Sequence, residues 1–160
     1  MHAPKTPAAL LMAALLVGCG GSETPDTQAN QPAASATAAA PAALTAIELE
    51  QGLGPIRDLQ LGPVDEALAA TGQQAFTMKC SACHKIESRY VAPMLGDVLS
   101  RRTPEFVMNM MLNATEMVQR HPEVQKLLAE FFTPMPVQIT DQSEARAILE
   151  YLRSAQIETP

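Results

Sequence analysis

The segment CSACH, residues 80–84, carries the side chains of this sequence that are best suited to chemistry. Cys80, Cys83 and His84 could bind zinc, form a redox disulfide or hold a haem. A closed zinc site needs four protein ligands, usually two pairs, and the chain after its first 18 residues adds only Cys19 and a lone His121. A thioredoxin-like cysteine pair belongs to a βαβ pattern, and the sequence has no alternating strand pattern of useful length. Covalent haem is the chemistry that remains.

The spacing within CSACH suits covalent haem for a physical reason. Two thiols about one helical turn apart can add to the two vinyl groups of a haem, and the adjacent imidazole then points at the iron. The motif therefore predicts one covalent haem c, bound by Cys80, Cys83 and His84. Attachment of this kind takes place outside the cytoplasm, so the protein should be exported.

The first 18 residues are built like an export signal, with Lys5, the apolar run 8–17 and no acidic residue. The run ends in LVGC, which resembles the lipobox of bacterial lipoproteins, so Cys19 is expected to be the acylated first residue of the mature chain. An ordinary signal peptide with a leftover cysteine is the alternative, as is a short membrane anchor, although the run is short for a bilayer span. The expected location is the cell envelope, anchored by lipid to a bacterial membrane with the folded part in the periplasm.

The charge of the mature chain argues against a nucleic-acid partner. Without Lys5 it has 10 basic and 17 acidic residues, a formal charge of −7. Residues 19–43 have little large apolar content to offset their ordering entropy, and they predict a flexible, lipid-anchored linker. Residues 44–64, broken by Gly-Pro steps, predict an extended lead-in, and the remaining length suffices for one folded domain.

Helical periodicity and capping signals predict an all-α domain with long loops. One helix is expected over 65–79, a second after Thr103 as N-cap, a third from Pro122, and a last one capped by Thr140 or Asp141. The predicted buried faces are Leu68, Gly72 and Phe76; Phe106, Val107, Met110 and Met111; Val124, Leu127, Leu128 and Phe131; and Ala145, Ile148, Leu149 and Leu152.

The sequence around the motif resembles the class I c-type cytochromes. Gly72, Phe76 and Cys80 follow that family's steps of four, and Tyr151 in AILEYLRS stands where an aromatic of the last helix packs on the glycine helix. The resemblance covers about residues 65–155. It implies the class I cytochrome c fold, with the helices of a cytochrome c domain, residues 65–160, wrapped around one haem. The block 54–118 also looks like mono-haem lipoprotein cytochromes associated with bacterial nitrous oxide reduction.

The resemblance implies a methionine as sixth iron ligand, in a loop before the last helix. Met135 in TPMPV occupies such a loop, and the fixed φ angles of Pro134 and Pro136 reduce the freedom lost when the sulfur is held. Met94, Met111, His121 and an open site remain as alternatives, with His121 expected at the surface because it precedes the helix start at Pro122.

The resemblance also assigns Pro93 a role: its carbonyl should accept a hydrogen bond from the iron-ligating His84 and fix the ring. The family often has glycine before that proline, and this chain has Ala92.

With His and Met both bound, the iron has no vacant position, so the predicted function is electron transfer and not catalysis. The expected partners are redox proteins, a membrane respiratory donor and a periplasmic reductase such as nitrous oxide reductase. Lys79, Lys85 and Arg89 flank the motif and could orient docking, or be ordinary solvated charges. The rival predictions are a haem sensor or peroxidase-like subunit with a displaceable sixth ligand, and a docked subunit that uses the lead-in as an interaction arm.

Overall fold

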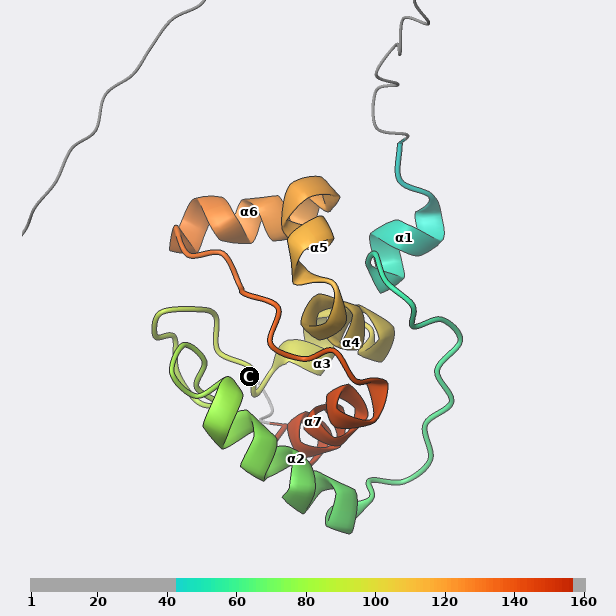
Figure 1. Cartoon of the computed structure of the whole chain (residues 1–160), viewed down its shortest axis with the longest axis vertical. Coiled ribbons are helices and arrows are strands. Elements are labelled where there is room, and N and C mark those ends of the chain that lie inside the picture. Colours follow the sequence, from blue (N-terminus) through green and yellow to red (C-terminus); the bar gives the residue numbers. More distant parts are fainter. Residues whose placement is uncertain (1–42, 157–160) are drawn as a thin grey trace, which may run out of the picture. The chain divides into compact units, whose positions relative to one another are not determined.

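The protein is described by a computed structural model over residues 43–156 (Figure 1). The predicted signal peptide 1–18, Cys19 and the linker as far as residue 42 lie outside the described residues. Within the described part the regular elements are all helices, which confirms the all-α prediction. They are α1 Ala46–Gln51, α2 Glu66–Lys79, α3 Val98–Arg101, α4 Pro104–Leu112, α5 Ala114–Arg120, α6 Pro122–Phe131 and α7 Gln142–Ser154. None of the helices within 43–156 has the length and apolar composition needed to cross a bilayer.

The first and last helices of the expected domain, α2 and α7, pack side by side (Figure 1). Gly72 permits this approach, because a Cβ at that position would lie 1.9 Å from the carbonyl oxygen of Ala147. One turn later the Phe76 and Tyr151 rings meet with their centroids 5.2 Å apart. The glycine and aromatic positions therefore hold the terminal helices together as the sequence predicts.

Helix α4 forms the centre of the domain and contacts α1, α3, α5 and α7. It begins as expected, with the Thr103 hydroxyl accepting a hydrogen bond from the Phe106 amide and Pro104 in the first turn. Its Val107, Met108 and Met111 join buried side chains of α2 and α7 in the main core.

The lead-in, residues 44–64, is less extended than expected. Thr45 and Glu48 form a reciprocal capping box, which starts the short helix α1 inside it. The buried Asn109 of α4 donates to the carbonyls of Gln51, at 2.8 Å, and Ile56, at 3.0 Å, and accepts from the Ile56 amide at 2.9 Å. The backbone polar groups of Gln51 and Ile56 thus find their hydrogen-bond partner inside the domain.

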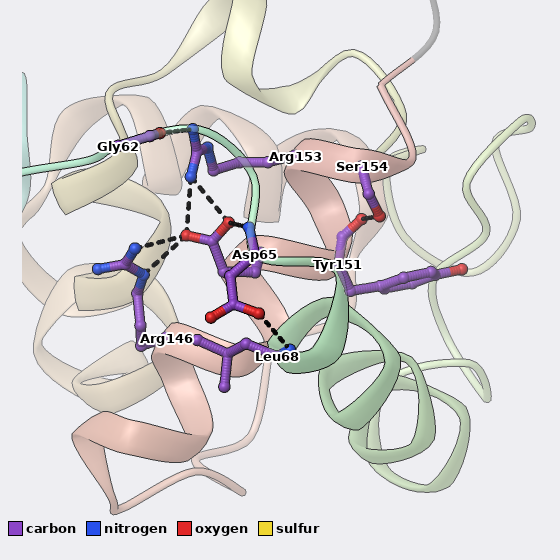
Figure 2. Close-up of polar contacts among 8 residues, drawn as sticks. Gly62, Asp65, Leu68, Arg146, Tyr151, Arg153 and Ser154 are labelled. Atoms are coloured by element: carbon purple, nitrogen blue, oxygen red, sulfur yellow. Dashed lines mark hydrogen bonds and ion pairs between the residues drawn. The ribbon is translucent and has the colours of Figure 1, made fainter.

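The C-terminal end of the lead-in is fastened to α7 through Glu150. Figure 2 labels the residues bonded to this carboxylate, Asp65, Arg146 and Arg153. This carboxylate has no exposed surface. It accepts hydrogen bonds from Arg146 and Arg153, at 2.6 and 2.8 Å, and from the Asp65 amide at 3.3 Å. Arg153 also donates to the Gly62 carbonyl at 2.7 Å. The salt-bridged cluster joins two segments far apart in sequence.

His121 is fully buried, so its expected surface position is wrong. Helix α5 brings it beneath the lead-in, where Nε2 donates to the Leu49 carbonyl at 3.2 Å. Nδ1 accepts from the Glu123 amide at 3.3 Å, so the imidazole caps α6. Its ring also meets Phe106 edge to face at 5.1 Å. These contacts use both ring nitrogens in holding α1, α4 and α6 together.

Candidate functional site

The motif residues sit in a tight turn that continues the end of α2. The amides of Cys83 and His84 both donate to the Cys80 carbonyl, at 3.0 and 2.9 Å. The two cysteines are half-buried and are not joined in a disulfide. Cys80, Cys83 and His84 all line one cavity, so the turn directs the three reactive side chains into the same space.

The His84 ring is oriented by the loop that follows the motif. Nδ1 lies 2.9 Å from the Pro93 carbonyl oxygen, which can only accept, so Nδ1 carries the proton and Nε2 keeps its lone pair. The loop closes although Ala92 replaces glycine, since the Ala92 amide donates to the Cys83 carbonyl at 3.1 Å. Burial lowers the pKa of His84, opposed in part by the bond to Pro93. The imidazole is therefore neutral at pH 7 and able to bind a metal.

The environment of Cys80 is unlike that of a reactive redox thiol. Burial, with a smaller contribution from Glu144, raises its pKa to about 11. The thiol is therefore protonated at neutral pH, whereas cysteines of disulfide exchange have lowered pKa values.

In addition, no three His, Cys, Asp or Glu side chains within 43–156 gather into a group that could hold a metal ion.

The cavity and the open solvent at its mouth together span about 1370 Å³ that no protein atom fills. Apolar side chains from α4, α6 and α7 form most of its wall. They include Phe106, Val107, Met110, Met111, Leu127, Leu128, Phe131, Ile148 and Leu152. Protein interiors contain few voids larger than a water molecule. A cavity of this size and lining, with two thiols and an imidazole at one side, fits a large flat apolar group such as haem.

Three methionines line the cavity: Met110 and Met111 from α4, and Met135 from the segment between α6 and α7. Met94 and His121 do not line it. Met78 is 75% exposed, and Met117 is fully buried elsewhere, with its sulfur accepting from the Leu53 amide at 3.0 Å.

The cationic groups near the motif are mostly paired within the chain. Lys79 contacts Glu144 at 2.6 Å, and Arg89 pairs with Glu130 at the end of α6. Lys85 donates to the Ser81 carbonyl at 2.7 Å. The positive rim considered from sequence is therefore largely compensated by carboxylates.

Two further cations, Arg101 and Arg102, line the cavity itself. Arg101 pairs with Asp97 at 2.6 Å, and Arg102 with Glu123 at 3.0 Å. These guanidinium groups carry additional N–H donors that could face an anionic substituent of a bound group.

A family model described as cytochrome c matches residues 69–156. The chain belongs to the cytochrome c family. Its cofactor is a covalently attached haem c, and Cys80 and Cys83 fit the attachment motif of the family. The family also supports haem-based electron transfer as the general function.

Solved structures agree with the family assignment. A cytochrome c from Rhodothermus marinus is 43% identical, with a TM-score of 0.65, over 68% of this chain and 94% of that one. An engineered form of it, Rma TDE, is 42% identical with a TM-score of 0.64, over 68% and 95% of the two chains. The same engineered protein bound to a carbene intermediate is 42% identical with a TM-score of 0.61, over 68% and 95%. No curated protein gives a significant match.

The site also includes contacts that the sequence does not reveal. Arg89, in the loop after the motif, lies over the Phe131 ring, with its guanidinium carbon 4.1 Å from the ring centroid. The two residues are far apart in sequence and carry no shared motif. Only the folded arrangement of the loop and α6 brings them together.

Proposed function

We propose that this cytochrome is a mono-haem electron carrier with His84 and Met135 as the axial iron ligands. The observation that carries the proposal is that both side chains, from different segments, line the cavity that also contains Cys80 and Cys83. Haem iron stores and releases one electron. Binding by imidazole and thioether together favours the reduced state relative to two imidazoles and leaves no vacant position.

The chain's own residues prepare the site before any electron moves. Pro93 holds the proton of His84 on Nδ1, so that Nε2 is the free donor atom. With haem bound, the apolar wall would exclude water, and the paired Arg101 and Arg102 would offer N–H groups to the haem carboxylates. Little rearrangement of the protein is then needed on oxidation or reduction.

The proposed setting is the cell envelope, with the lipid on Cys19 holding the carrier at a bacterial membrane and residues 19–43 serving as a tether. Anchoring raises the effective concentration of the carrier for membrane partners. The donor would be a membrane respiratory complex and the acceptor a periplasmic reductase, with nitrous oxide reductase suggested by the resemblance of the block 54–118. No catalytic role is needed for this function.

The test is the absorption spectrum of protein matured in a host that attaches haem c. Sulfur ligation gives oxidised haem a weak far-red band, and Met135→Ala should abolish it while Met111→Leu retains it. Met111 is the appropriate control because it also lines the cavity. A wild-type spectrum without that band would count against the proposal.

A displaceable sixth ligand is the second candidate, and it would make the protein a haem sensor or peroxidase-like subunit. The observation that favours it is that the backbone of residues 133–140 forms no hydrogen bond within the described part of the chain. Ready binding of carbon monoxide to the reduced wild-type protein would support this candidate over the carrier.

A further inference from the structure

The segment that carries Met135 is held weakly by its backbone. Residues 133–140, the ligand strap, make no backbone or side-chain hydrogen bond among residues 43–156. Pro134 and Pro136 have no N–H to donate. Ile139, only 2% exposed, and the half-buried Met135 are the side chains that attach the strap to the core. The position of the strap therefore depends on what fixes its two ends.

The C-terminal end of the strap is fixed by α7, whose N-cap Asp141 accepts from the amides of Ser143 and Glu144 at 2.8 and 3.0 Å. The other end follows α6 and the exposed Phe132, which has a left-handed φ of 55°. Phe132 is 85% exposed and supplies no packing of its own. The fixation at this end must come from the last residues of α6.

Arg89, in the loop after the haem-binding motif, contacts these last residues of α6. Its guanidinium lies over the ring of Phe131, 4.1 Å from the centroid, and pairs with Glu130. Phe131 is the last residue of α6 and lines the cavity. Arg89 itself belongs to the loop that also brings the Pro93 carbonyl to His84.

We infer that Arg89 is a positioning residue that sets how firmly Met135 is held at the iron. The inference rests on the proposed function, because it requires Met135 as the ligand. Arg89 connects the loop of the His84 side with the helix end that leads into the ligand strap. Loss of the contact frees the N-terminal end of the strap, so Met135 leaves the iron more often and an external ligand competes better.

The size of the effect follows from the exposure of the contact. An exposed ion pair contributes little, and Arg89 and Glu130 have side chains 58% and 51% exposed. Stacking of the guanidinium on Phe131 is the larger component. Removal of Arg89 should therefore raise the affinity of a competing ligand about two- to fivefold.

The experiment is a titration of the oxidised, haem-loaded protein with imidazole, followed by the main haem absorption band. Arg89→Gln is expected to bind imidazole about two- to fivefold more tightly than the wild type. Arg89→Lys keeps the charge but loses the planar stacking, and should fall between them. Arg120→Gln is the matched control, because it removes a surface arginine paired with Glu116 and lining no part of the cavity.

The outcomes separate this inference from the proposed function. A far-red band in all forms, with equal imidazole affinity in wild type and Arg89→Gln, would overturn the role of Arg89 while leaving the Met135 ligand in place. A wild type without the band would overturn both. An equal rise of imidazole affinity in Arg120→Gln would show general destabilisation and overturn the inference. If Arg89→Gln fails to fold, Phe131→Leu removes the ring on which the guanidinium stacks. Imidazole affinity must then rise as well, and an unchanged affinity would overturn the inference.

Discussion

Glu150 is a carboxylate with no exposed surface that nevertheless remains charged. Burial acts to raise its pKa, but hydrogen bonds from Arg146 and Arg153, and one from the Asp65 amide, outweigh that effect and lower it. Both arginines reach toward solvent while holding the buried oxygens. The residue thus stabilises the domain in its ionised form.

Glu150→Gln is expected to lower the free energy of unfolding by about 2 kcal/mol at neutral pH, since two guanidinium groups lose their anionic partner. A carboxylate whose pKa is lowered on folding contributes stability above its ordinary pKa of 4.5 and loses it as the pH falls through the lower folded value. The difference between wild type and variant should therefore shrink below pH 4.5. Denaturant unfolding across that range measures it.

The control for this prediction is Glu87→Gln, which changes an exposed carboxylate in no ion pair within the described chain. It should leave stability nearly unchanged at every pH. A constant gap between Glu150→Gln and wild type down to strongly acidic pH would contradict the charged role of Glu150.

At the scale of single residues, sequence reasoning works where type and spacing alone define the chemistry. Cys80, Cys83 and His84 are such residues, and the haem c cofactor follows from them. Glu150 and His121 are different, because their burial depends on partners such as Gly62, Asp65 and Leu49 that are brought near by the fold. No local pattern distinguishes them from surface residues.

The contact between α2 and α7 is the element-scale feature most sensitive to a single substitution. In Gly72→Ala the new Cβ would lie 1.9 Å from the Ala147 carbonyl oxygen and 2.9 Å from the Ile148 amide nitrogen, both backbone atoms of α7. The helices must separate, and a loss of about 3 kcal/mol or more in unfolding free energy is expected. Thermal or denaturant unfolding of the haem-loaded protein checks this.

Gly62→Ala is the matched control, because nothing lies within 4 Å of its new Cβ. Restricting the unfolded chain should leave that variant as stable as the wild type or slightly more so. If Gly72→Ala has the same unfolding free energy as Gly62→Ala, the close approach of α2 and α7 does not limit stability.

The helices differ in how far sequence could predict them. Those with a strong start signal, α2, α4, α6 and α7, begin at the predicted positions. Helix α5 has no side-chain hydrogen bond at its N-cap, and α3 is a single turn without one. Such short helices are stabilised by packing on their neighbours, which sequence periodicity does not record. The capping box of α1 can be read from Thr45 and Glu48 in TAIE, but six residues are too few for a helical period to support it.

For the whole molecule, the net charge determines how a charged redox reagent approaches the haem site. The chain is acidic overall, and Lys79 and Arg89 are paired with Glu144 and Glu130. Because paired charges cancel beyond a short distance, we expect the acidic net charge to dominate the approach of a small redox reagent.

Stopped-flow oxidation by ferricyanide tests that expectation. The rate constant should stay constant or rise between about 0.01 M and 0.15 M salt, since screening weakens repulsion between like charges. Lys79→Gln should lower it less than about twofold at the higher salt. A rate constant that falls steeply with added salt would show instead that an uncompensated positive rim attracts the anion.

The attachment of the lead-in to α4 and α7 also has a mechanical consequence. A pull on the chain at residue 43 enters the domain through α1 and reaches Asn109 in the central helix α4. Farther along the same segment, Glu150 and Arg153 clamp residues 62 and 65 to α7 before the chain enters α2. The load is therefore transferred to α4 and α7, and the helix that ends in the haem-binding motif is relieved of strain.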